Sequence, residues 1–206
     1  SGYTGTAKTD LLPRLAALDV QTLDLEGLAN HRGSLLGDRA EPQPSQKAFE
    51  TELAMALTRL DPAKPVIVEA ESSKIGLRLL PPSLWAAMIA APLITLDAPL
   101  DARARYLAQA YADILADKVL LMGKLDVLRQ FRGHAIVDRW AELSAAGDDV
   151  ALCRALVEDH YDPAYATSMR EKAGRISAHV TTNSLTPEAL NHTANQIKLA
   201  LQTIST

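Results

Sequence analysis

The 206-residue sequence has little of what several protein classes require. Its single cysteine, Cys153, excludes a disulfide framework and a cysteine-rich metal site. Cys153 lies in an amphipathic helical pattern, so we expect a small core residue. No run of 18 apolar residues could span a membrane, and the start lacks the basic and apolar regions of a signal peptide. These absences favour a reducing, cytoplasmic setting and no membrane partner.

The chain also lacks an excess of positive charge. It has 21 Lys and Arg against 25 Asp and Glu, a net charge of −4. This balance argues against a general nucleic-acid coat, and RNA binding would need a local basic patch. The length and the 48% hydrophobic content fit one globular domain with a large core, and no repeats or low-complexity linker appear.

What the chain does have is a phosphate-binding loop at its start. The stretch Gly2-Tyr3-Thr4-Gly5-Thr6-Ala7-Lys8-Thr9 matches G-x-x-x-x-G-K-[ST], with Ala7 in place of the second glycine. Such loops turn successive backbone N–H groups toward phosphate oxygens, and the glycines permit the required backbone angles. The lysine reaches the terminal phosphates, and the threonine hydroxyl is placed to bind Mg²⁺. The alternative is a glycine- and threonine-rich turn that only caps a helix.

Ala7 adds a condition to this interpretation. Because alanine disfavours a positive φ, we expect Ala7 to lie already in the first turn of the helix that follows. Leucines at helical spacing predict that helix over residues 7–18. Its positive end would then support anion binding.

Alternating strand and helix patterns predict an α/β fold with a parallel sheet, as in P-loop NTPases. Strands are expected over residues 20–25, 65–71, 93–96 and 177–181, and a long loop over 24–44. Helices are expected over residues 45–60 and 81–91, and a final helix from Thr186. A helical insertion is expected at about 100–172, with breaks near Gly123, Gly133 and Gly147. The chain is treated as one P-loop domain, residues 1–206. Because the chain begins on the loop, the central strand that precedes such a loop is missing, and its place should be a deep apolar slot.

Acidic residues follow the apolar strand 65–71. Carboxylates at the carboxyl end of such a strand lie where a P-loop protein holds Mg²⁺ or an attacking water. Glu69 and Glu71 alternate along the strand, so only one of them can face the loop side.

Several strings together resemble the C-terminal P-loop domain of the bacterial tRNA 2-selenouridine synthase family. They are the loop 2–9, DLEGLANHRGS at 24–34, QPSQ at 43–46 with Phe49 and Glu50, EAESSKIG at 69–76, and HYDP at 160–163. The resemblance implies transfer of a geranyl group from geranyl diphosphate to the sulfur of 2-thiouridine in tRNA, and replacement of S-geranyl by selenium from selenophosphate. It also implies a rhodanese-like domain, which this sequence does not contain.

The chemistry of such a transfer suggests roles for individual residues. Displacing diphosphate requires that its charge be neutralised, while the thiouridine sulfur is itself the nucleophile. We expect Lys8, Arg32 and Glu69 to be catalytic, and the loop to hold diphosphate. Mg²⁺ would be held by Thr9 with Glu69 or Glu71, and the groups facing the diphosphate or the RNA backbone would be His31, Arg32, Gln46 and Lys74.

Plainer interpretations stay open for each residue. Arg32 could be a solvated loop charge, His31 could hydrogen-bond within the loop, and Glu69 could cap a helix or pair with Lys74. Arg103 and Arg105 could be lid arginines or ordinary exposed charges. For the whole protein, the alternatives are a small-molecule kinase or nucleotide-dependent phosphotransferase, and a non-catalytic RNA-binding module.

Overall fold

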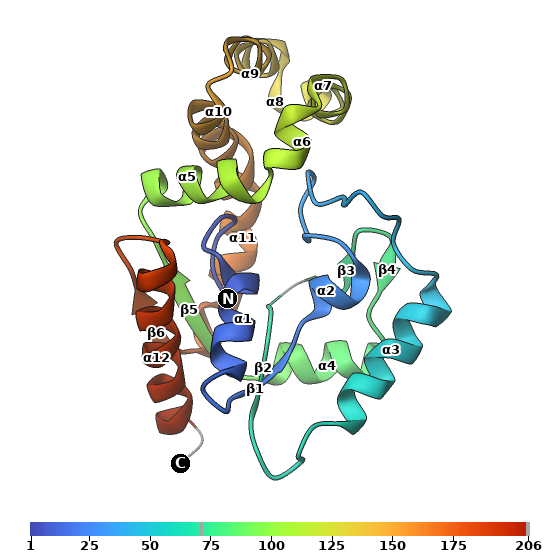
Figure 1. Ribbon diagram of the computed structural model, residues 1–206, viewed down its shortest axis with the longest axis vertical. Coiled ribbons are helices and arrows are strands. Elements are labelled where there is room, and N and C mark those ends of the chain that lie inside the picture. The colour runs from blue at the N-terminus through green and yellow to red at the C-terminus, as the bar shows by residue number, and fades with distance from the viewer. Residues whose placement is uncertain (71, 205–206) are drawn as a thin grey trace.

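The computed structural model describes residues 1–70 and 72–204, so the prediction for Glu71 lies outside the described residues. The chain folds as an α/β protein (Figure 1). The strands are β1 (Gln21–Leu23), β2 (Val66–Val68), β3 (Lys74–Ile75), β4 (Arg78–Leu79), β5 (Leu93–Asp97) and β6 (Ile176–Thr181). No helix in the described part of the chain is long and apolar enough to cross a membrane.

The strands pair two by two. β1 pairs with β2 and β5 pairs with β6, both in parallel, whereas β3 and β4 form a small antiparallel hairpin. The expected parallel pairing is therefore present, but within residues 1–70 and 72–204 it does not extend into one continuous sheet. A cavity of about 340 Å³ is lined by residues of both β2 and β5, so the two parallel pairs face each other across it.

Helices make up most of the rest. Their bounds are α1 (Lys8–Ala16), α2 (Leu25–Ala29), α3 (Gln46–Thr58), α4 (Pro82–Ala90), α5 (Leu100–Ala110), α6 (Ala112–Ala116), α7 (Lys118–Asp126), α8 (Arg129–Arg132), α9 (His134–Ala146), α10 (Asp149–Leu156), α11 (Asp162–Lys172) and α12 (Pro187–Ile204). A single π-helical turn (Val157–Tyr161) joins α10 to α11, and a short 3₁₀ turn (Ala173–Arg175) follows α11. The helices α5 to α11 lie between β5 and β6 in the chain, and most of them gather at one end of the molecule (Figure 1).

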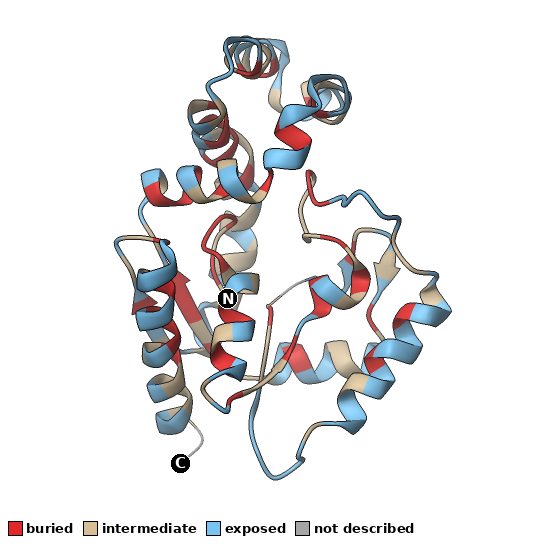
Figure 2. Cartoon of the chain, viewed as in Figure 1, coloured by how far each residue is buried: buried red, intermediate tan, exposed pale blue. Residues whose placement is uncertain are grey.

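Three apolar cores hold these elements. The helical end packs around Trp140, which is fully buried, and includes Cys153. Burial raises the pKa of the Cys153 thiol to about 12, which agrees with its predicted role as a core residue. A second core joins α1, β5, β6 and α12, and a third lies under α2, α3 and α4 (Figure 2). The phosphate-binding loop leads into α1 and therefore rests on the second core.

The predicted helix cap at Ser45 was confirmed, whereas the predicted loop and helix breaks were only partly confirmed. The Ser45 hydroxyl accepts the Ala48 N–H and caps α3, as predicted. The loop expected over 24–44 instead begins with α2, capped by Asp24. The predicted break at Gly123 was wrong, since α7 runs through it, whereas Gly133 and Gly147 do separate helices.

Candidate functional site

The loop 2–9 forms a tight turn ahead of α1. Gly5 adopts φ +85°, a region that favours glycine. At Gly2, an added Cβ would lie 2.7 Å from the carbonyl oxygen of Leu96, so the backbone of the loop packs directly against β5. The predicted need for a special backbone angle is therefore confirmed for Gly5, whereas Gly2 is required for its close approach to β5 and not for a positive φ.

The expectation for Ala7 was wrong. Ala7 is the residue before the first turn of α1 and has φ 59° and ψ 32°, the left-handed conformation. This conformation costs an alanine roughly 1–2 kcal/mol, and the loop retains it because the residue is buried within the second core. No side chain of the described residues caps α1, and its first turn contains one acidic residue, Asp10.

A cavity of about 420 Å³ lies in front of this loop. The loop and the first turn of α1 form one wall, and residues 32–34 with Arg39 contribute another. The helical end completes it with Tyr106, Leu107, Gln109, Ala110, Tyr111 and Tyr165. The lining is mostly polar, and its less polar part consists of the tyrosine rings, Leu107 and Ala110.

Lys8 lies at the floor of the cavity. Its ammonium group donates to the carbonyl oxygens of Gly2 and Tyr3, at 3.1 and 3.3 Å. The lysine is therefore folded back over its own loop, with its charge above the backbone that would surround a phosphate. Arg32 and Arg39 line the same cavity, so three cations converge on it. The sequence had singled out the first two, but not Arg39.

A chain of carboxylates connects α1 to β2. The Thr9 hydroxyl donates to Glu26 Oε2 at 2.8 Å, and Glu26 lines the cavity. Glu69, which follows β2, contacts the start of α2. Its Oε2 accepts the backbone N–H groups of Leu25 and Glu26, at 3.0 and 3.3 Å. Glu69 therefore caps α2 and fixes the residue that meets Thr9. The sequence pattern did not identify Glu26, because the contact joins positions 17 residues apart.

Arg32 is held in place from three sides. Its guanidinium pairs with Asp113 at 2.8 Å, donates to the carbonyl oxygen of Asp38 at 3.0 Å, and lies 5.4 Å from the ring centroid of Tyr111. The Tyr111 hydroxyl is in turn 2.7 Å from the Ser34 hydroxyl. Arg32 is thus an anchored cavity residue rather than a solvated loop charge.

His31 is buried beneath the cavity and does not line it. Its Nδ1 accepts the Gly33 N–H at 3.1 Å, so the proton of the neutral ring is on Nε2, which lies 3.4 Å from Asp38. Desolvation by burial lowers the pKa of His31 below its usual value. Its contacts are those of a residue that shapes the loop 31–38.

Gln46 and Lys74 lie apart from the cavity. The Gln46 amide bonds to both the N–H and the carbonyl oxygen of Leu79, which ties α3 to the β3–β4 hairpin. Lys74 is exposed on that hairpin. Neither residue lines the cavity in the described part of the chain, so their predicted contacts with the diphosphate or the RNA backbone would require a substrate that extends beyond it.

Arg103 has a role that the sequence did not suggest. It is buried, pairs with both carboxylate oxygens of Asp162 at 2.6 and 3.0 Å, and donates from Nε to the carbonyl oxygen of Thr4 at 2.9 Å. The guanidinium also lies 5.3 Å from the ring centroid of Tyr3. Arg103 therefore connects α5 and α11 to the phosphate loop and positions its backbone.

The described residues contain no group of three or more His, Cys, Asp and Glu side chains that could hold a metal ion. The hydroxyl of Thr9 and the carboxylate of Glu26 nevertheless provide two oxygen donors beside the loop. Mg²⁺ typically takes only one or two protein oxygens and completes its shell with waters and substrate phosphates. These two residues fit such a shared site.

Comparison with known proteins identifies the family. Residues 1–136 match the family model described as the tRNA 2-selenouridine synthase AAA domain. The chain is 34% identical over 203 residues to the tRNA 2-selenouridine synthase of Cupriavidus pinatubonensis, covering 85% of this chain and 54% of the relative. It is 34% identical over 204 residues to that of Hahella chejuensis, covering 85% and 53%.

The chain thus spans about half the length of the curated relatives it matches. No solved structure matches it. The family match and the identity to named relatives agree with the resemblance that the sequence motifs indicated, and the chain belongs to the tRNA 2-selenouridine synthase family.

Proposed function

We propose that this chain is the part of a tRNA 2-selenouridine synthase that binds geranyl diphosphate and transfers its geranyl group to the sulfur of 2-thiouridine in tRNA. The observation that carries the proposal is the cavity that brings the loop 2–9 beside the tyrosine rings and Leu107 of the helical end. The loop would bind the diphosphate, and these side chains would contact the prenyl chain. We expect the enzyme to act in the cytoplasm, on tRNA and geranyl diphosphate.

The loop would receive the diphosphate. Backbone N–H groups of residues 5–7 and the N-terminal end of α1 would surround its oxygens, and Lys8 would leave its loop carbonyls to pair with it. Arg32 and Arg39 would neutralise the remaining charge from the opposite wall. These contacts stabilise the negative charge that develops on the leaving diphosphate, and so act on the transition state.

Thr9 and Glu26 would hold a Mg²⁺ ion shared with the diphosphate. When bound, the ion supplies additional positive charge at the leaving group. Glu69, which we predicted as a ligand, would act by fixing α2 and thereby Glu26. This proposal moves the Mg²⁺ ligand from Glu69, at the end of β2, to Glu26 on α2.

The geranyl chain would lie along Leu107 and the rings of Tyr106, Tyr111 and Tyr165. The sulfur of 2-thiouridine would then attack the first carbon of the chain, forming a C–S bond as the C–O bond breaks and the electron pair leaves with diphosphate. No protein nucleophile is needed for this step. Replacement of S-geranyl by selenium would draw on selenophosphate, and the greater length of the relatives leaves room for a rhodanese-like partner domain.

Calorimetric titration with geranyl diphosphate and Mg²⁺ tests the proposal. Lys8→Ala should weaken binding by about 10- to 100-fold, because a hydrogen bond to a charged group contributes roughly 1.5–3 kcal/mol. Lys64→Ala is the matched control, since Lys64 is exposed and remote from the cavity lining. Unchanged affinity in Lys8→Ala would refute the assignment. Turnover of ATP without binding of geranyl diphosphate would favour a kinase or phosphotransferase instead.

A further inference from the structure

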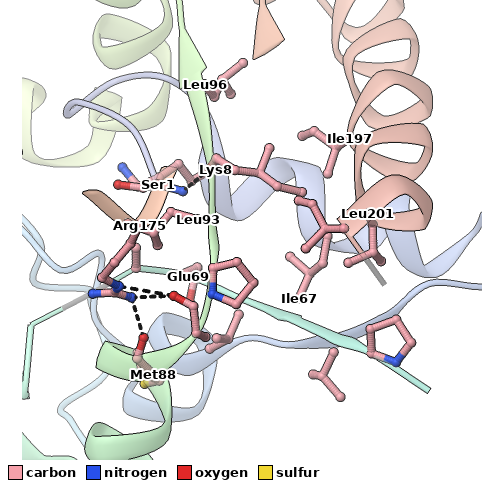
Figure 3. A pocket seen from close by; sticks show the side chains of 18 of the residues that line it. Ser1, Lys8, Ile67, Glu69, Met88, Leu93, Leu96, Arg175, Ile197 and Leu201 are labelled. Atoms are coloured by element: carbon pink, nitrogen blue, oxygen red, sulfur yellow. Dashed lines mark hydrogen bonds between the residues drawn. The ribbon is translucent and has the colours of Figure 1, made fainter. Parts of the chain in front are cut away.

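Two cavities of this protein differ in what they could bind. The cavity between the two parallel strand pairs is lined mostly by apolar side chains (Figure 3). The cavity in front of the loop 2–9 is instead lined mostly by polar side chains. Because proteins recognise the edge of a nucleobase through hydrogen bonds, the second of these cavities is the one suited to the base of an RNA substrate.

The mouth of this polar cavity is marked by its exposed lining residues. These are Asp10, Arg39 and Gln109, whereas the other lining residues are buried or half-buried. A tRNA is far larger than a cavity of about 420 Å³. Enzymes that modify a base take it out of the stack, so the reacting base would enter the cavity through this mouth.

Gln109 is the mouth residue with hydrogen-bonding groups left for a base. The carboxylate of Asp10 accepts the hydroxyl of Tyr106. Arg39 is a cation, which suits the diphosphate better than a neutral base. The side-chain amide of Gln109 makes no hydrogen bond within the part of the chain that the structure describes. A donor and an acceptor are therefore both available at this position on α5.

The amide of Gln109 matches one edge of 2-thiouracil. That edge presents the N3–H donor beside the O4 acceptor, and a side-chain amide offers one acceptor and one donor at a similar spacing. The sulfur is bonded to the neighbouring ring carbon, C2, and takes no part in this pairing. A base held through N3–H and O4 at the mouth would therefore keep its sulfur free to face the interior of the cavity.

We propose that Gln109 binds the N3–H and O4 atoms of 2-thiouridine and so presents the sulfur to the first carbon of the geranyl chain. This inference rests on the proposed function, which supplies the identity of the base and of the prenyl donor. It adds a substrate-binding residue at the mouth to the diphosphate-binding residues at the floor. The two groups of residues would thus hold the two substrates from opposite ends of one cavity.

The test compares two tRNA anticodon stems, one containing 2-thiouridine and one with an abasic site at the same position. Their affinities are measured for the 206-residue chain, for Gln109→Leu and for Gln130→Leu. Gln130 is exposed and lies outside the cavity lining, so it is the matched control. Gln109→Leu should weaken binding of the 2-thiouridine stem by about 5- to 100-fold, the range for a two-point contact with a base edge. The abasic stem should bind Gln109→Leu and the unchanged chain equally, and Gln130→Leu should bind both stems as the unchanged chain does.

Three results would overturn the proposal. Equal losses on both stems would show that Gln109 acts on the RNA backbone or on folding rather than on the base. No loss on the 2-thiouridine stem, or no binding of that stem by the unchanged chain, would remove Gln109 from the recognition of the base. Failure of the proposed function would appear separately, as absence of geranyl diphosphate binding in calorimetry, and the comparison of the two stems would still test Gln109.

Discussion

Replacing Gly5 by alanine should lower the free energy of unfolding by about 1–4.5 kcal/mol. The φ of +85° costs an alanine roughly 1–2 kcal/mol. The new Cβ would also lie 2.9 Å from the Leu107 side chain and 3.2 Å from the carbonyl oxygen of Arg103, and such overpacking costs about 1–3 kcal/mol. The reduced entropy of the unfolded chain offsets about 0.4–1 kcal/mol of this sum.

Two other glycines separate the backbone term from the contact term. Gly147 has a φ of +72° but no neighbours within 4 Å, so Gly147→Ala should cost only about 0.5–1 kcal/mol. Gly123 lies inside α7 with no neighbours within 4 Å, so Gly123→Ala should stabilise the protein by about 0.5–1 kcal/mol.

Urea unfolding monitored by circular dichroism measures all three variants on one scale. The structure predicts the order of stability as Gly123→Ala, then Gly147→Ala, then Gly5→Ala. If Gly5→Ala costs no more than Gly147→Ala, the loop does not pack against α5 as described, and the derived cavity geometry is wrong.

Two further predictions concern buried charges. Because burial lowers the pKa of His31, the unfolded chain binds more protons below about pH 6.5, and the stability due to neutral His31 is lost as the pH falls toward its folded pKa. Unfolding free energies from pH 7.5 to 5 should therefore decline, and His31→Gln should flatten the decline; an unchanged slope in the variant would contradict this. Arg103→Met and Asp162→Asn should show a coupling of about 1–3 kcal/mol in a double-mutant cycle, since they share a partly buried, two-point ion pair. A coupling below about 0.5 kcal/mol would show that the pair does not fix the loop.

Much of the local structure could be predicted from the sequence. The glycines of the loop, the cap at Ser45 and the start of α12 at Pro187 depend on residues within one turn of each other. Such short-range rules do not depend on the rest of the fold. The same is true of Lys8 and Thr9, whose spacing from Gly2 and Gly5 places them at the loop in any P-loop protein.

The sequence could not reveal contacts between distant positions. Arg103 reads as an exposed helix charge until Asp162 and Thr4 are brought beside it. Glu26 becomes a cavity residue only because Glu69 caps α2. Ala7 accepts a left-handed conformation because tertiary packing around it outweighs its local preference. Each depends on the packing of elements against one another, which sequence spacing does not report.

The most direct test of the central claim is the intact mass of a tRNA anticodon stem containing 2-thiouridine, measured after incubation with the protein, Mg²⁺ and geranyl diphosphate. The assay is run with the 206-residue chain. We predict a gain of one geranyl group, lost in Lys8→Ala and retained in Lys64→Ala. No gain, although both substrates bind, would contradict geranyl transfer at this site.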